Sequence, residues 1–72
     1  MHFKDLIKIV KARRESLSVT QEALAELSGV GLRTLKQFER GKGNPTFLTL
    51  FKLGDALGLE ITFSPQKQGG NP

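Results

Sequence analysis

Apolar residues recur at helical spacing along the first part of the chain. They fall at Phe3, Leu6, Ile7, Val10 and Leu17, with lysines on another face, and this pattern predicts an amphipathic helix over residues 3–15 rather than a strand. Thr20 is a favourable N-cap for a second, shorter helix that ends at Gly29. The residues that this second helix is expected to turn inward are Leu24, Ala25 and Leu27. The chain is therefore expected to begin with two helices joined by a short connection.

Two further helices are expected after a tight connection at Gly29-Val30-Gly31. Leu35 and Phe38 mark the buried face of a third helix, which the glycine-rich segment 40–45 ends. Thr46 is the expected N-cap of a fourth helix. The apolar set of the fourth helix consists of Phe47, Leu50, Phe51, Leu53 and Leu57. Residues 1–58 therefore predict an all-α, four-helix domain.

The pattern changes after Gly58, which closes the fourth helix. Residues 59–64 alternate apolar and polar side chains, which is the period of a half-buried β-strand. The apolar positions of this strand are Leu59, Ile61 and Phe63. No other segment of the chain has the pattern of a partner strand. Residues 65–72 carry no large apolar side chain and are expected to form a disordered tail.

Length and composition restrict the classes of protein to consider. Seventy-two residues suffice for one domain, which excludes a multidomain enzyme. The chain has no cysteine and a single histidine, His2, so neither a disulfide nor a Cys/His zinc cluster is expected. A domain this small is only marginally stable, which favours support from oligomerisation.

Basic residues are concentrated in the first part of the chain. Residues 1–42 hold nine basic and five acidic residues, whereas residues 43–72 hold two of each, so the net charge of +4 lies in residues 1–42. This part is where a polyanion is expected to bind. No apolar run approaches the roughly 20 residues of a transmembrane helix, and residues 1–10 lack the form of a signal peptide. These features predict a cytoplasmic protein with no membrane partner.

The sequence shows no pattern typical of catalysis. It has no acidic pair beside a nucleophile and no glycine-rich phosphate loop after a strand, and its only histidine lies at the terminus. Glu22 and Glu26, four residues apart on one helix, are interpreted as a solvated face rather than as a metal site or acid/base pair. The chain is therefore expected not to be an enzyme and to use no metal or cofactor.

The second and third predicted helices, joined by a glycine-containing turn, have the architecture of a helix-turn-helix DNA reader. Motifs at fixed spacings across residues 6–58 resemble the XRE/Cro/lambda-repressor family of helix-turn-helix proteins. The motifs that carry the resemblance are Thr20-Gln21-Glu22-Ala23-Leu24-Ala25, Ser28-Gly29-Val30, Leu35, Phe38-Glu39-Arg40-Gly41, Asn44-Pro45-Thr46 and Thr49-Leu50. The resemblance implies a lambda-repressor-like domain that binds double-stranded DNA and regulates transcription.

The outward face of the third helix carries residue types that read bases. With its buried face turned inward, this helix is expected to point outward Leu32, Arg33, Lys36 and Gln37. Arginine pairs well with guanine and glutamine with adenine, because each makes two hydrogen bonds to that base in the major groove. The resemblance places base contacts at Leu32, Arg33 and Gln37, with Lys36 near the backbone or a base. Leu32 departs from the polar residue common in the family, so we expect it to contact a thymine methyl group.

Phosphate-binding groups are expected on both sides of the third helix. Free N–H groups at a helix N-terminus bind anions, which makes the Thr20-Gln21 end of the second helix a candidate. The resemblance carries a phosphate contact over to the Gln21 side chain. A second clamp is predicted at Arg40, Lys42 and Asn44, in a glycine-rich loop that lets backbone amides approach the DNA strand. The alternative interpretation of these residues is a solvated basic face beside a flexible loop.

Other charged residues are interpreted as structural or as solubilising. Arg14 and Glu39 fall on or beside the apolar stripes of their helices, where an unpaired charge costs free energy, so we expect them to pair. The resemblance places a partly buried bridge between the first and third helices at these positions. A stripe of lysines on the first helix, at Lys4, Lys8 and Lys11, is interpreted as aiding solubility rather than binding.

A repressor of this type needs two reading helices, since one helix covers only about four or five base pairs. Residues 59–64 are expected to pair with their copy about a two-fold axis, which gives a homodimer with Leu59, Ile61 and Phe63 in its interface. The alternative is that the strand pairs within its own chain or frays. The dimer would bind a palindromic operator with its two reading helices about 34 Å apart.

The last part of the chain adds a second resemblance. The run Leu57-Gly58-Leu59-Glu60-Ile61-Thr62-Phe63 is similar to HipB-type antitoxins, in which a strand replaces the usual fifth helix. This resemblance implies the antitoxin of a bacterial toxin–antitoxin operon, which represses its own promoter on the nucleoid and binds a HipA-like kinase toxin. Two alternatives stay open: a phage or metabolic repressor of the same family without a toxin partner, and a protein-interaction module that does not bind DNA.

Overall fold

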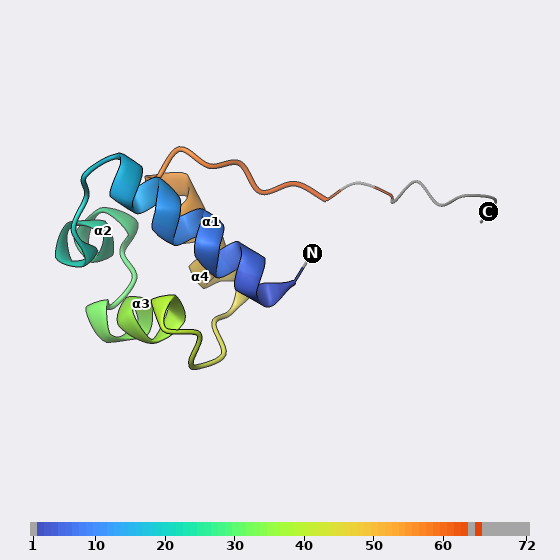
Figure 1. Ribbon diagram of the computed structural model, residues 1–72, viewed down its shortest axis with the longest axis horizontal. Helices are drawn as coiled ribbons and strands as arrows, with labels where there is room; N and C mark the ends of the chain where they lie inside the picture. Colours follow the sequence, from blue (N-terminus) through green and yellow to red (C-terminus); the bar gives the residue numbers. More distant parts are fainter. Residues whose placement is uncertain (1, 64, 66–72) are drawn as a thin grey trace.

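The computed structural model describes residues 2–63 and residue 65, and this part of the chain folds as four α-helices. Helix α1 spans Phe3–Ser16, α2 spans Gln21–Ser28, α3 spans Leu32–Glu39 and α4 spans Phe47–Ala56. Figure 1 shows α1 running in front of α4, with α2 and α3 joined by a short connection beside them. The described residues confirm the all-α class, and none of their helices is long and apolar enough to cross a membrane.

The helix ends of the motif form as the sequence predicts. The Thr20 hydroxyl accepts a hydrogen bond from the backbone N–H of Ala23 at 3.0 Å, and the Thr46 hydroxyl accepts one from Thr49 at 3.1 Å. Each threonine satisfies one of the N–H groups that the first turn of a helix leaves unpaired. Gly29 ends α2 in the left-handed backbone conformation, with φ of +77°, where glycine is free of strain. Local capping therefore decides where α2 begins and ends and where α4 begins.

A hydrophobic core lies between the helices. Its members are Ile7, Val10, Leu24, Val30, Leu35, Phe38, Leu53 and Leu57. Leu35 has no exposed surface and Phe38 is 1% exposed, so both residues anchor α3 against the core. Because these two residues hold one side of α3 inward, the opposite side of the helix must face solvent.

One inward residue predicted for α2 is exposed instead. Leu27 is 68% exposed, whereas Leu24 has no exposed surface and Ala25 packs against the core. Half-buried Ala25 and Ser28 lie on one side of Leu24 on the helical circumference, and Leu27 lies on the other side. A helix of eight residues buries only a narrow stripe, so the prediction for Leu27 is wrong.

Helix α4 also buries fewer apolar residues than predicted. Leu53 and Leu57 lie in the core, and Gly54 is buried beside them. Phe51 is 48% exposed, on the flank of α4 away from Leu53, and Phe47 is 54% exposed in the first turn, where it lines an open groove with Leu6 and Ile9 of α1. The expected apolar set of α4 is therefore divided between the core and an exposed face.

After α4 the chain continues in an extended, non-helical conformation (Figure 1). The β-strand expected over residues 59–64 is not formed by the described residues of the single chain, because a strand needs a hydrogen-bonded neighbour and no described segment supplies one. Ile61 packs instead over Gly54, where an added Cβ would lie 3.4 Å from the Ile61 side chain. Phe63 stacks on Phe47, with ring centroids 5.7 Å apart. Residues 64 and 66–72, which include most of the expected tail, lie outside the described residues.

Candidate nucleic-acid interface

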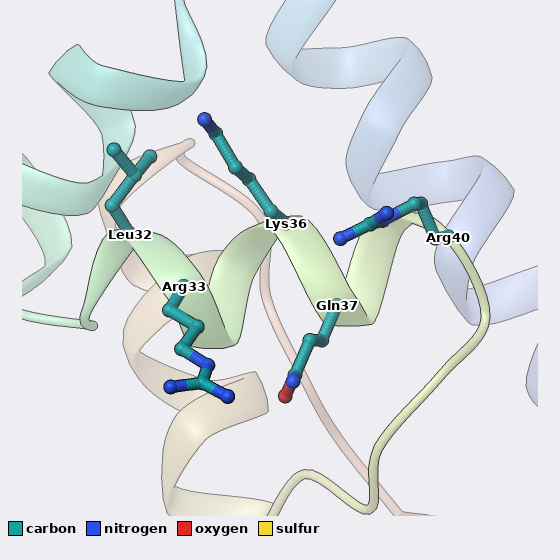
Figure 2. Close-up of a pocket in the computed structure, with 5 residues that line it drawn as sticks. All are labelled: Leu32, Arg33, Lys36, Gln37 and Arg40. Atoms are coloured by element: carbon teal, nitrogen blue, oxygen red, sulfur yellow. The ribbon is translucent and has the colours of Figure 1, made fainter.

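The outer face of α3 presents the four predicted base-reading residues together with Arg40 (Figure 2). A shallow, open pocket of about 360 Å³ is lined by Leu32, Arg33, Lys36, Gln37 and Arg40. In Figure 2, which looks onto this face, Leu32 and Lys36 project along one edge of it, and Arg33 and Gln37 project along the other edge. The structure thus brings the residues assigned to base reading onto one surface, and it adds Arg40, which was assigned to the loop clamp.

This face of α3 carries positive charge and an amide but no carboxylate. Arg33 and Arg40 are exposed, and Lys36 and Gln37 are half-buried. Glu39, the acidic residue of α3, is buried on another side of the helix. An exposed helix of this width fits the major groove, where cations meet phosphates and where arginine and amide side chains meet base edges. The arrangement can therefore attract a polyanion and distinguish one base from another.

We call the outer face of α3 the reading face, after the role predicted for it. Beneath it, Arg14 of α1 and Glu39 of α3 form a largely buried ion pair. Arg14 Nε and Nη2 donate to the two carboxylate oxygens of Glu39 at 2.7 and 2.9 Å, and the two side chains are 12% and 3% exposed. Arg14 Nη1 also donates to the carbonyl oxygen of Val19 at 2.8 Å. The hydrogen bond to Glu39 raises the pKa of Arg14 above its ordinary value, against the lowering effect of burial. The two residues that the sequence expects to pair are therefore joined at two points, the strongest geometry for such a pair.

Gln21 extends this network, in a contact that sequence reasoning missed. Its Nε2 donates to Glu39 Oε1 at 3.0 Å, so the network joins α1, α2 and α3. The sequence gives no signal for this bond, because helical periodicity says nothing about which polar side chains meet across two helices. Gln21 keeps one amide hydrogen to donate to a phosphate, since an amide nitrogen carries two hydrogens and the bond to Glu39 uses one.

The N-terminus of α2 uses part of its hydrogen-bonding capacity within the chain. The Thr20 hydroxyl accepts from Ala23, and the Thr20 carbonyl accepts from the N–H of Leu24 at 2.9 Å. The N–H groups of Gln21 and Glu22 precede these two in the first turn, and they are the groups that an anion can approach.

The turn between α3 and α4 holds the second set of predicted phosphate ligands. These residues, all exposed, are Arg40, Lys42 and Asn44. The Lys42 N–H donates to the Gln37 carbonyl at 2.8 Å, which fastens the turn to the end of α3. Gly41 and Gly43 have φ of +77° and +80°, values that allow the chain to reverse tightly here. The predicted clamp therefore lies directly beside the reading face.

Candidate metal ligands do not cluster in the part of the chain that the structure describes. Within these residues, no group of three or more His, Cys, Asp or Glu side chains comes together. Glu22 and Glu26 are both exposed on α2. The polar side chains that the fold does gather are those of the Arg14–Glu39–Gln21 network and those that line the pocket on α3.

Comparison with known proteins finds a family and several relatives. The family model described as Helix-turn-helix matches residues 10–64, which include α2, α3 and α4 in full. An uncharacterized HTH-type transcriptional regulator, y4dJ, of Sinorhizobium fredii is 43% identical over 49 residues, which are 68% of this chain and 62% of that protein. The cryptic phage CTXphi transcriptional repressor RstR of Vibrio cholerae is 37% identical over 49 residues, which are 68% of this chain and 44% of RstR.

A third relative comes from Methanothermobacter thermautotrophicus. This uncharacterized HTH-type transcriptional regulator is 35% identical over 52 residues, which are 72% of this chain and 75% of the relative. The chain therefore spans less than two thirds of the length of y4dJ and of RstR, and three quarters of the archaeal regulator.

Proposed function

Because the chain belongs to the XRE-type helix-turn-helix family, we propose that it is a sequence-specific DNA-binding transcriptional repressor that holds a palindromic operator as a homodimer. The observation that carries this proposal is the outer face of α3, which gathers two arginines, a lysine and an amide around one pocket (Figure 2). The relatives at 43%, 37% and 35% identity are named as transcriptional regulators or as a repressor, which supports the same role.

In this proposal α3 lies in the major groove and reads bases with its outer side chains. Arg33 donates two hydrogen bonds to a guanine, and Gln37 pairs at two points with an adenine. Leu32 contacts a thymine methyl group, and Lys36 reaches the backbone or a base. The support for this assignment is that all four side chains project from one face that the core leaves in solvent.

Phosphates on either side of the groove are bound by two clamps. The first consists of Thr20 and Gln21 at the N-terminus of α2, where backbone N–H groups and the helix dipole favour an anion. The second consists of Arg40, Lys42 and Asn44 in the turn after α3, all of them exposed. Because phosphate contacts position the protein without reading sequence, the clamps hold α3 in register while its side chains distinguish the bases.

The homodimer forms through residues 59–64, which pair with their copy as an antiparallel ribbon. Support comes from the exposed apolar side chains of this segment, since Ile61 is 37% exposed and Phe63 is 85% exposed, while Leu59 packs against the core. Residues 43–72 carry no net charge, so two copies can meet there without repulsion. The paired segments would cover the apolar side chains and the backbone groups that a single chain leaves unpaired.

The dimer acts in the bacterial cytoplasm as a HipB-like antitoxin, which represses its own operon and binds a HipA-like kinase toxin. Support comes from the resemblance of residues 57–63 and from the extended, non-helical course of residues 59–63, at the place where a fifth helix would otherwise follow. Recovery of a kinase with the full chain from its source cell, and a kinase gene beside its own gene, are the results expected of an antitoxin. Operator binding without either of these results would instead favour the second candidate, a phage repressor, to which the similarity with RstR points.

Selection of bound duplexes from a random DNA pool tests the proposal. The full chain should enrich a palindrome, and Arg33→Ala should enrich the same palindrome with one relaxed position in each half-site. Gln37→Ala is the matched variant, and it should relax a different position. Failure of the wild-type chain to enrich any sequence, with no salt-dependent binding to DNA, would contradict the proposal and favour a protein-interaction module.

A further inference from the structure

Helix α1 carries a stripe of cations outside the reading face of α3. Lys4, Lys8 and Lys11 are all exposed, and the sequence pattern alone suggests only a solubilising role for them. In the structure this stripe lies on the flank of α1 next to the face that contacts α3.

One face of α1 touches α3 and the turn after it. The rings of Phe3 and Phe38 meet edge to face, with centroids 6.1 Å apart. The side chain of Ile7 lies 3.8 Å from the point where a Cβ on Gly41 would stand. Lys4 and Lys11 stand three residues before and four residues after Ile7, which places both on the same side of it along the helix.

The flank of α1 that carries these lysines faces away from α4. Arg13 Nε donates to the carbonyl oxygen of Leu57, at the end of α4, at 2.9 Å. Leu6 and Ile9 line a groove together with residues of α4. The flank of α1 that carries these three residues is therefore turned toward α4. At about 100° per residue, Lys4, Lys8 and Lys11 fall on the opposite flank, beyond the face that meets α3. The lysine stripe therefore borders α3 on the side away from α4.

Arg40 connects this stripe to the reading face. It stands between Glu39, whose carboxylate binds Arg14, and Gly41, which lies against Ile7. The stretch of α1 from residue 7 to residue 14 therefore runs beside Arg40, and Lys11 projects from this stretch. Arg40 also lines the pocket on the outer face of α3. Arg40 thus stands at the end of α3, next to the residues that α1 contacts, between the pocket on α3 and the helix that carries the lysines.

Among the described residues, no carboxylate forms a salt bridge with a lysine of the stripe. Across residues 2–63, the single salt bridge is the one between Arg14 and Glu39. The nearest carboxylates along α1 are Asp5, which accepts a hydrogen bond from the backbone N–H of His2, and exposed Glu15. The lysines are therefore available to an external anion.

We propose that Lys4, Lys8 and Lys11 bind backbone phosphates of the same DNA duplex that α3 reads, and so extend the interface onto α1. This inference rests on the proposed DNA-binding function, because the stripe borders the reading face and no other ligand is implied. The contacts carry no sequence information, since a lysine ammonium binds any phosphate.

The test measures binding of the full chain to a mixed-sequence duplex several helical turns long, by fluorescence anisotropy over a range of salt concentrations. Lys11→Gln should lower the slope of log affinity against log salt by about 0.9, the value for one lost phosphate contact on duplex DNA. The combined substitution of all three lysines should lower the slope further. The matched control is Lys52→Gln, which removes the same charge from an exposed position on α4 and should leave the slope of the wild type unchanged.

The outcomes separate this inference from the proposed function. If the wild type shows salt-dependent binding but Lys11→Gln and Lys52→Gln behave alike, the lysine stripe acts only through net charge and the inference is wrong. If the wild type does not bind the duplex at low salt, the proposed function fails and the inference fails with it. Thermal melts of the variants should match that of the wild type, because these exposed lysines support no core contact.

Discussion

Two exposed faces of the molecule differ in chemistry. The outer face of α3 exposes cations to solvent, whereas the face formed by α4 and residues 59–63 exposes apolar side chains. On α3 the apolar Leu35 has no exposed surface, and the exposed side chains include Arg33 and Arg40. On the other face, Phe47 and Phe63 are 54% and 85% exposed. Exposed cations are stable in water, whereas each exposed aromatic ring forgoes burial that stabilises at roughly 25 cal/mol per Å². The first face is therefore complete in one chain, and the second has the character of a surface that pairs with another apolar surface.

The largest expected effect follows removal of residues 59–72. The shortened chain should become monomeric and should lose about 10²- to 10⁴-fold in operator affinity, because two linked reading helices bind with a high effective concentration. Sedimentation and a DNA titration measure the two properties. Phe63→Lys should reproduce the loss without affecting the core, since this side chain is 85% exposed. Removal of residues 66–72 alone is the control, and it should change neither property. A 1–58 fragment that stays dimeric would contradict the ribbon and show that the helices hold the two copies together.

The next largest effect concerns the polar network beneath α3. Glu39→Ala should lower the free energy of unfolding by roughly 3–5 kcal/mol, because it removes the only carboxylate that pairs with the largely buried guanidinium of Arg14 among the described residues. Arg14→Lys should cost less, since it keeps the charge and loses the bidentate geometry. A thermal melt measures both effects, and a melting temperature of Glu39→Ala close to that of the wild type would contradict this role.

The same network predicts how stability should depend on pH. Folding raises the pKa of Arg14, so its contribution is fully present below the unfolded pKa and is lost only as pH rises through the folded pKa. Both values lie far above neutral pH, so the contribution of Arg14 should stay constant through the neutral range. A melt series at several pH values around neutrality checks this expectation, with Arg14→Lys as the comparison.

A smaller effect is expected at the reading face itself. Arg33→Ala should cost about 1–3 kcal/mol on the cognate operator and should relax the preference at one base pair of each half-site. The fold should be unaffected, because the Arg33 side chain is exposed. Competition titrations with single-base operator variants measure the effect, and an equal loss on every sequence would identify Arg33 as a phosphate contact instead.

The smallest effect is expected at the turn after α3. Lys42→Ala should weaken binding to all sequences alike and should lower the salt slope by about 0.9, because it removes one phosphate contact. Its backbone N–H still binds the Gln37 carbonyl in the variant, so the turn should keep its shape. A slope equal to that of the wild type would mean that Lys42 is only a solvated side chain.

Helix boundaries and the solvent-facing side of α3 follow from local sequence. Thr20, Thr46 and Gly29 act within one turn of their own helices, so their roles can be inferred without knowledge of the fold. The spacing of Leu35 and Phe38 likewise specifies which side of α3 faces solvent. These features depend on residues at most four positions apart, and pattern reasoning describes them correctly.

Burial of the remaining apolar residues does not follow from local pattern in the same way. Leu27 and Phe51 satisfy a helical period, yet both are exposed, because the neighbouring helices cover only a narrow stripe of α2 and α4. The strand expected over residues 59–64 depends on a partner that the described part of the chain does not supply, and Ile61 packs on Gly54 instead. The periodicity of apolar residues identifies the apolar face of a helix or strand, but it does not identify the element that covers this face.

Local sequence alone thus specifies the four helices, their caps and the basic outer face of α3, because capping and periodicity act over one or two turns of chain. Packing between helices adds the bond from Gln21 to Glu39 and places Ile7 of α1 against Gly41 in the turn after α3. These contacts join residues far apart in sequence, and they depend on the angle and rotation at which each helix meets its neighbour. That geometry comes from the shared core, because only the assembled fold decides which side of α1 lies toward α3 and which side is left to its lysines.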